Sequence, residues 1–249
     1  MAEEKSTWKR PDSLQVPTVW RRCEGLLQMS DGKKPKFIIQ DLDEEYLEEA
    51  IELMSTCFCK DEVMFSALKI IDDPISMEEL KNLWRDMSRQ KAALVALTDD
   101  GSARPRVVGV NMTYVCRIQD KYSPDDFRGT AMKAMARDGM VFVCNYVNIF
   151  KLYGVTEFLG AFGLVVHPHY RGQGLGVEIL RTRRSLGKAL GLKVTMTFFS
   201  TVQGQKSAEK AGMQLLAQLP YSIFKTEDGK EVYPISVPKT LKIMAMRLD

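Results

Sequence analysis

The sequence predicts an α/β protein of the α+β kind, and three observations predict it. A run that is apolar on both faces of a strand, residues 158–166, leads through a glycine-rich turn into a helical pattern and then into a strand at 193–200. Two β-rich runs within 92–115 are joined by Asp100-Gly101 and a proline, which is the turn chemistry of a hairpin. Amphipathic helical patterns occupy much of the remaining chain.

The chain begins with a segment that lacks a regular pattern. Residues 1–35 combine prolines and charges without a sustained hydrophobic period, so we expect an N-terminal tail, followed by one domain over 36–249. The tryptophans of the tail suggest that it docks on the domain surface. A short strand is expected at 35–42, followed by an amphipathic helix at 43–58 with an acidic start.

Two further helical regions precede the apolar strand. Ser76 and Glu79 have the spacing of a capping box, which predicts that the second amphipathic helix starts at Ser76. Residues 125–155 predict one or two helices, whose methionines we interpret as core side chains and not as a cofactor site.

Helices and strands alternate in the last third of the chain. A helix over 176–191 is stopped by Gly191, and a short helix over 204–213 follows the strand at 193–200. Two strands are expected around 213–225 and 231–247.

Composition excludes several classes of protein. The 249 residues are 45% hydrophobic and 27% charged, and a net charge of +3 is too small to indicate a nucleic-acid partner. No apolar run approaches the roughly 20 residues that span a bilayer, and the start lacks a signal peptide, so we expect no membrane partner and a cytoplasmic protein. The five cysteines are odd in number and lie mostly within apolar runs, so we expect reduced thiols. Their spacing does not match a metal site, so we expect no metal.

The glycine-rich turn, residues 167–176, is the clearest functional signal. A strand, bare glycines and a helix start direct unpaired amides and the helix dipole at one point, which attracts phosphate. Arg171 adds a positive charge, and Gly172, Gly174 and Gly176 remove side chains that would keep phosphate away. The sequence therefore predicts a diphosphate site.

The spacing of this turn distinguishes between families that bind phosphate in this way. A P-loop would need Lys-Ser or Lys-Thr, and a dinucleotide fold would need other glycine spacing. Arg171-Gly-Gln-Gly-Leu-Gly176 resembles the R/Q-x-x-G-x-G/A pattern of the GCN5-related N-acetyltransferase (GNAT) superfamily, and the resemblance extends over roughly 36–247.

The resemblance implies a fold and a cosubstrate. The fold would be a single mixed, mostly antiparallel sheet of about seven strands, flanked by helices on both faces and splayed at a central parallel pair. The cosubstrate would be acetyl-CoA, held by Leu164, Val165, Val166, Arg171, Gly172, Gln173, Gly174, Leu175 and Gly176.

Two segments resemble insect arylalkylamine N-acetyltransferases more narrowly. They are FCKDEVMF at 58–65 and the C-terminal stretch 226–248, and they imply a small arylalkylamine substrate such as dopamine, serotonin, tryptamine or octopamine. The chain departs from the pattern at Val63 in place of a proline, at Ala208 in place of a frequent tyrosine acid, and near Lys239 in place of a histidine.

Acetyl transfer needs a base, a polarised carbonyl and a protonated leaving thiol. Since an alkylamine is almost wholly protonated at pH 7, we expect Glu62 to act as general base during direct attack in a ternary complex. The amides near 164–166 would polarise the carbonyl, and Ser207 or water would protonate the thiolate. His167 and His169 are interpreted as parts of the loop scaffold.

Alternatives remain open at the level of sequence. The acceptor amine could belong to a polyamine, an agmatine-like molecule or a protein N-terminus, and the chain could instead bind acyl-CoA without turnover, as Ala208 would allow. We expect a monomer or a weak dimer.

Overall fold

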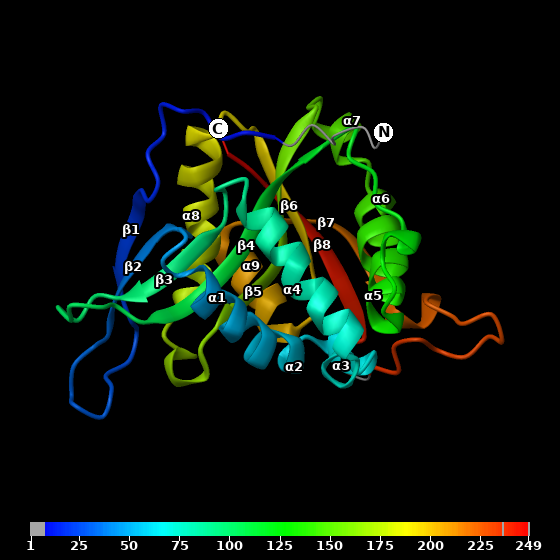
Figure 1. The fold of residues 1–249 in the computed structure, drawn as a ribbon, viewed down its shortest axis with the longest axis horizontal. Helices are drawn as coiled ribbons and strands as arrows, with labels where there is room; N and C mark the ends of the chain where they lie inside the picture. Colours follow the sequence, from blue (N-terminus) through cyan, green and yellow to red (C-terminus); the bar gives the residue numbers. More distant parts are fainter. Residues whose placement is uncertain (1–7, 236, 249) are drawn as a thin grey trace.

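An eight-stranded sheet forms the centre of the computed structural model, which describes residues 8–235 and 237–248 (Figure 1). The strand order is β1-β2-β3-β4-β5-β6-β8-β7, and every neighbouring pair is antiparallel except β5 and β6. The strands are β1 Val19–Glu24, β2 Lys36–Asp41, β3 Leu94–Thr98, β4 Val107–Arg117, β5 Glu157–Val166, β6 Val194–Phe199, β7 Gln214–Pro220 and β8 Thr240–Arg247. The predicted fold class is confirmed, with one strand more than expected.

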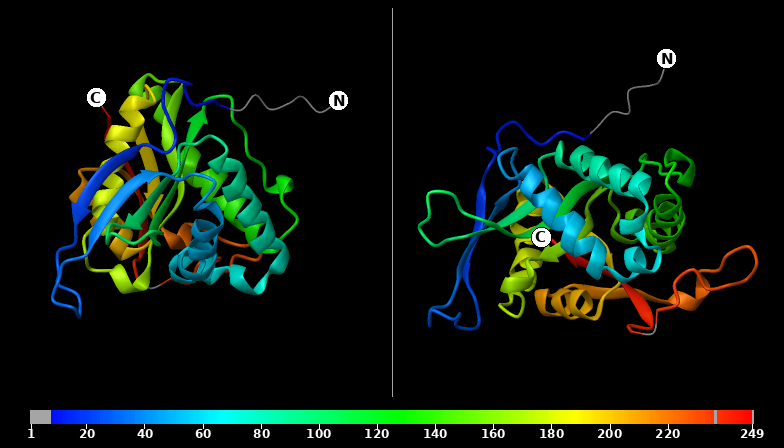
Figure 2. Two further views of the ribbon diagram at one scale, coloured as in Figure 1. Left: turned by 60° about the vertical axis from the view of Figure 1, so that its left-hand side comes forward. Right: turned by 60° about the horizontal axis from the view of Figure 1, so that its bottom comes forward.

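Helices cover both faces of this sheet (Figure 2). On one face lie α1 Leu47–Leu53, the wide π-helical turn Met54–Phe58, α2 Cys59–Asp61, α3 Val63–Ala67, α4 Pro74–Ser88 and α5 Thr130–Met135, which continues into the π-helical stretch Ala136–Val143, α6 Cys144–Tyr146 and α7 Ile149–Tyr153. On the other face lie α8 Leu175–Ala189 and α9 Val202–Ala211. The methionines of 125–155 are buried in the larger core layer, as predicted.

The start of α4 differs from the capping-box prediction. Asp73 is the N-cap, and its Oδ1 accepts a hydrogen bond from Ser76 N at 3.0 Å, so the predicted N-cap at Ser76 was wrong by three residues. Glu79 instead accepts hydrogen bonds from the main-chain amides of Arg128 and Gly129. Pro74 at the first helical position suits this earlier start, because its ring fixes a helical φ and lacks an amide to satisfy.

The last two strands are shorter than predicted. β7 ends at Pro220 and β8 begins at Thr240, and the intervening segment has one isolated bridge between Lys225 and Glu231. Pro234 and Pro238 lie in this segment, and proline cannot donate to a strand ladder. β7 pairs with β8 in antiparallel orientation.

Part of the expected N-terminal tail joins the sheet. β1 pairs with β2 along the sheet edge, and Trp8 and Trp20 pack against the smaller core layer under α8. Residues 1–7 of the expected tail lie outside the described residues, and the division of the chain at 35/36 stays a prediction. No strand was expected here because prolines and charges obscure the alternation of this edge strand.

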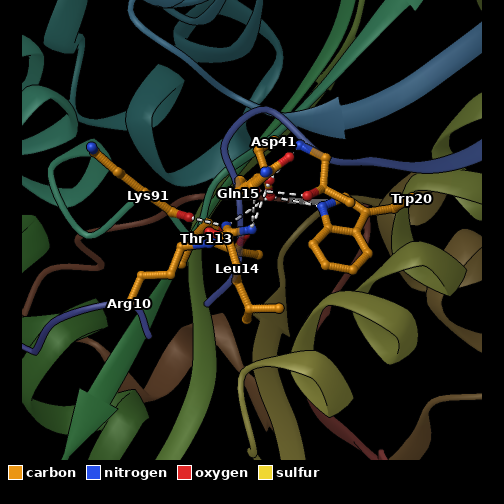
Figure 3. A network of polar contacts seen from close by, with 9 residues as sticks. Arg10, Leu14, Gln15, Trp20, Asp41, Lys91 and Thr113 are labelled. Carbon is orange, nitrogen blue, oxygen red and sulfur yellow. Dashed lines mark hydrogen bonds and ion pairs between the residues drawn. The ribbon is translucent and has the colours of Figure 1, made fainter. Parts of the chain in front are cut away.

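A buried polar network fixes this segment to the domain (Figure 3). Arg10 makes a bidentate contact with Asp41, at 2.9 and 2.8 Å, and Trp20 Nε1 donates to Asp41 Oδ1 at 2.7 Å. The Asp41 side chain is completely buried and also accepts from Thr18 N. Paired charges with satisfied hydrogen bonds specify one geometry here, since any unpaired member would be costly.

Replacing Trp20 with Phe should lower the free energy of unfolding by about 1.5 kcal/mol, because it removes a hydrogen bond to a buried carboxylate while retaining most of the apolar surface. Chemical denaturation of both proteins measures the difference. Unchanged stability would show that the indole N–H does not help to anchor the segment.

All five cysteines are free thiols, as expected. Among the described residues, the helices are too short or too polar for any to traverse a lipid bilayer.

Candidate active site

The glycine loop between β5 and α8 has the geometry of an anion site. Gly172 and Gly174 both adopt left-handed backbone angles, with φ of 78°, which side chains disfavour. Among the described residues, the amides from Gly172 to Gly176 donate to no protein acceptor, and the last two form the start of α8. Free amides at a helix N-terminus bind phosphate oxygens readily.

The next feature is the splay between β5 and β6. Leu159 and Thr195 are the single register pair of these parallel strands, so the strands diverge toward the glycine loop. His167 N donates to Val108 O on β4, and alternation along the strand then directs the amide of Val165 to β4. The amides of Leu164 and Val166 therefore face the opening, whereas that of Val165 does not.

A bulge in β5 widens the splay. The pairing with β4 shifts between Asn111 and Thr113, and Gly163 has a φ of 122°. This φ strains any residue with a side chain, and a Cβ atom at Gly163 would also displace the methyl group of Met54, so glycine suits this position. Asn111 Nδ2 holds the bulge by donating to Gly163 O at 2.7 Å. Bulges redirect strands next to active sites, and this one opens space beside α1 and the turn that follows it.

Glu62 is a buried carboxylate at the break between α2 and α3. Its ψ of 118° ends α2, and its Oε2 caps α3 by accepting from Phe65 N at 2.7 Å. The other oxygen, Oε1, makes no hydrogen bond to the described residues. Burial raises the pKa of Glu62 above the ordinary 4.5, while the nearby Ser200 hydroxyl and the amides of Phe65 and Met64 oppose the shift.

One cavity of about 660 Å³ connects these features. Its lining includes the glycine loop, the open edge of β5 from Ala161 to Val166, and Glu62. Arg171 also lines it, with Nη2 at 2.5 Å from Asp61 Oδ2 and Nε donating to Val166 O. Asp61 and Arg171 thus form an exposed ion pair, whereas Glu62 is buried beside it.

The cavity wall around Glu62 is aromatic. Phe58 and Phe65 lie edge to face at 5.7 Å between ring centroids, and Phe65 meets Phe162 in the same way at 6.1 Å. Phe198 lines the wall from β6. This wall suits a flat apolar group, because aromatic rings favour edge-to-face and offset packing.

Other predicted site residues lie elsewhere. Gln173 does not line the cavity: its Oε1 accepts from Leu27 N at 2.8 Å and its Nε2 donates to Met29, so its side chain holds the β1–β2 loop. Ser207 lines the cavity on α9, with its Oγ 3.6 Å from the position that a Cβ of Gly176 would take. Ser207 therefore lies beside the glycine loop.

The histidines belong to the loop scaffold. His167 Nδ1 accepts from His169 N, and both rings pack edge to face on Tyr170. Burial lowers the pKa of His167. Neither lines the cavity, which agrees with the sequence interpretation.

Several cavity residues were missed from the sequence, and three of them bear on the chemistry of the site. Ser200 lies beside Glu62, Leu26 packs on Gly174 from the β1–β2 loop, and Arg183 reaches the splay from α8. Arg183 had a visible signal, since it occupies the apolar stripe of its helix, where a charge is unusual. Ser200 and Leu26 carry no comparable signal.

Acetyl-CoA fits the cavity on structural grounds. The free amides and Arg171 suit a diphosphate, and the open edge of β5 suits an amide-bearing arm, because it offers strand donors without a partner. Within 8–235 and 237–248, no cluster of three or more His, Cys, Asp or Glu forms a metal site.

A splayed mixed sheet with a glycine loop opposite a buried carboxylate defines an acyltransferase of the GNAT fold. No family model and no curated protein matches the chain. A solved structure of a yellow fever mosquito (Aedes aegypti) protein, provisionally named arylalkylamine N-acetyltransferase 7, is 32% identical, with a TM-score of 0.89 over 97% of this chain and 100% of that one.

More distant structures share the fold. Arylalkylamine N-acetyltransferase 2 of Aedes aegypti is 17% identical, with a TM-score of 0.76 over 86% of this chain and 99% of its own. A polyamine N-acetyltransferase of Drosophila melanogaster, which forms N-acetylagmatine, is 16% identical, with a TM-score of 0.67 over 85% and 99%.

The chain belongs to the arylalkylamine N-acetyltransferase family of the GNAT superfamily. It is accordingly an amine N-acetyltransferase, and acetyl-CoA is its cosubstrate.

Proposed function

We propose that the protein transfers acetyl from acetyl-CoA to the primary amine of a small arylalkylamine, by direct attack in a ternary complex with Glu62 as general base. The observation that carries the proposal is the aromatic wall around one buried carboxylate with a free oxygen. The name of the 32% identical mosquito protein supports the same substrate class.

Glu62 suits the role of base. An alkylamine with a pKa near 10 is neutral in only about one molecule in a thousand at pH 7, so attack requires removal of a proton. Glu62 lines the cavity, its buried Oε1 makes no hydrogen bond among the described residues, and Oε2 is fixed by Phe65 N, which orients the carboxylate. The raised pKa makes the ionised form a better proton acceptor.

The amides of Leu164 and Val166 suit the cosubstrate. Their N–H groups face the splay, so they can bind the pantetheine arm and the thioester carbonyl. Main-chain donors aimed at a developing oxyanion contribute a few kcal/mol each. The diphosphate would bind at Arg171 and at the amides of Gly172, Gln173, Gly174, Leu175 and Gly176, while Ser207 would contact the cosubstrate beside this loop.

A polyamine or an agmatine-like acceptor is the second candidate. Such a molecule carries a second cation, which would need its own carboxylate. Of the described residues that line the cavity, Asp61 and Glu62 are the acidic ones, and Asp61 already pairs with Arg171. The wall therefore favours an arylalkylamine.

An amine panel with acetyl-CoA tests the proposal, with CoA release as the measurement. Tryptamine, tyramine, dopamine, octopamine and serotonin should give kcat/KM at least about tenfold above agmatine and spermidine, because the aromatic wall leaves a second cation unpaired. A protein N-terminal peptide completes the panel. Higher kcat/KM for agmatine, spermidine or the peptide would contradict the proposed substrate class.

A further inference from the structure

Arg183 is a completely buried cation in the splay. Its Nε donates to Asn111 Oδ1 at 2.7 Å, and its Nη1 donates to Thr197 Oγ1 at 2.9 Å and more weakly to Thr195 Oγ1. All three partners are neutral. Burial lowers the pKa of Arg183 to about 9, so the side chain remains protonated at neutral pH.

The remaining nitrogen, Nη2, has no hydrogen-bond partner among the described residues, and Arg183 lines the cavity. A buried donor without an acceptor is costly, and more so when it is charged. A cation surrounded by neutral groups at the edge of a ligand cavity favours a ligand that brings negative charge.

The network of Arg183 locates that charge along the cavity. Asn111, which accepts from Nε, donates to the carbonyl of Gly163 in the bulge. Thr195 Oγ1 donates to Leu159 O at the point where β5 and β6 still pair, before the strands diverge. The guanidinium therefore lies between β5 and β6 at the level of the bulge.

The cosubstrate's thioester should reach the same level. Its diphosphate binds the glycine loop, and its arm follows the open amides of Val166 and Leu164 toward the bulge. Ser207 lies near Val166, because both approach the same Cβ position at Gly176. Gly163 is three residues farther along β5, or about 10 Å. Arg183 is thus better placed for the sulfur than Ser207.

We propose that Nη2 of Arg183 hydrogen-bonds the thioester sulfur of acetyl-CoA and stabilises the thiolate that leaves. Glu62 first passes the ammonium proton to solvent, and the neutral amine nitrogen then bonds to the carbonyl carbon. The C–S bond breaks with its electron pair going to sulfur, and the second proton that the nitrogen loses goes to Glu62. The thiolate leaves as an anion beside the guanidinium. No protein acid is then required, which accounts for Ala208 at the position of the frequent tyrosine.

This inference rests on the proposed transferase reaction, but its first test needs CoA binding alone. The thiol pKa of CoA bound to the wild-type protein is measured from the pH dependence of its alkylation by iodoacetamide. An ordinary thiol titrates near 8.5. We expect the pKa of the bound thiol to be at least about one unit below the thiol pKa of free CoA under the same conditions, by analogy with thiols beside cations. A bound value equal to or above that of free CoA would overturn the inference.

Variants assign the effect to the guanidinium. Arg183→Gln should return the bound thiol pKa to that of free CoA and lower kcat by a factor of about 10²–10³, with KM for acetyl-CoA changed only a few-fold. Arg183→Lys should retain part of the shift. Arg184→Gln, an exposed change on the same helix, is the matched control and should behave as wild type.

The outcomes separate this inference from the proposed function. If Arg183→Gln raises KM but leaves kcat and the thiol pKa unchanged, Arg183 is a binding residue, and its proposed role in stabilising the leaving thiolate is refuted. If that variant does not fold, Arg183→Lys and the wild-type titration still decide. A lowered thiol pKa in a protein that acetylates no amine would refute the proposed substrate class and leave the Arg183–sulfur contact standing.

Discussion

Glu62→Gln is expected to lower kcat/KM for every amine by a factor of about 10²–10⁴, the usual contribution of a general base. Gln retains an oxygen that can cap α3 by accepting from Phe65 N, so the change removes the basic oxygen without removing the cap. Steady-state rates of CoA release give the comparison. Glu52→Gln, an exposed change on α1, is the control and should retain wild-type rates.

The same variant has a signature in the pH dependence. Because burial raises the pKa of Glu62 above 4.5, the wild-type kcat/KM should fall as pH drops through that raised value, and Glu62→Gln should lack this acidic limb. An acidic limb that persists in the variant would assign the base to another group.

The stability of Glu62→Gln distinguishes a chemical role from a structural one. The folded protein binds the Glu62 proton more tightly than the unfolded chain does, so its stabilising contribution is present at low pH and is lost as pH rises through the raised folded pKa. Gln carries no charge to bury. At pH 7 the free energy of unfolding of the variant should therefore be at least equal to that of wild type. A less stable variant would contradict this reasoning.

Gly176→Val is expected to weaken acetyl-CoA binding at least about 100-fold with little effect on the fold. A Cβ atom at Gly176 would stand 3.6 Å from Ser207 Oγ and 3.8 Å from Val166 Cγ2, which are ordinary contacts, and its φ is not left-handed. The added methyl groups would occupy the cavity beside the free amides. In the helix itself, replacing glycine costs nothing, since glycine is among the poorest helix formers.

Thermal unfolding with and without acetyl-CoA measures this effect. At 100 times its Kd, acetyl-CoA should stabilise wild type by about 2.7 kcal/mol, and Gly176→Val should lose this stabilisation while keeping the stability of the free protein. Gly176→Ala is the matched control, because the resemblance pattern allows alanine at this position. Equal acetyl-CoA stabilisation of Gly176→Val and wild type would place the cosubstrate elsewhere.

Gly174 is a less suitable position for this test. Its φ of 78° is left-handed, and a Cβ there would lie 3.1 Å from Leu26 Cδ1. A bulky residue at Gly174 would therefore lower stability as well as binding, and the two effects would be hard to separate.

Local patterns in the sequence determined the loop and most of the elements. The alternating glycines, the apolar strand and the helix start are contiguous from 158 to 191, so their joint geometry follows from neighbouring residues. As predicted, the amides from Gly172 to Gly176 have no acceptor in the part of the chain that the structure describes. The helix of 43–58 and the hairpin of 92–115 were predicted for the same reason. The start of α4 was misplaced because Ser76 and Glu79 matched a capping pattern while Asp73 made the actual cap.

Only the tertiary structure decided which distant residues meet. Sequence patterns report which face of an element is buried, but they do not report which element covers it. The burial of Glu62 beside Ser200, the attachment of Gln173 to the β1–β2 loop, and the entry of Arg183 into the splay each join segments far apart in the chain. These contacts depend on sheet order and on the divergence of β5 from β6, which are properties of the whole packed sheet.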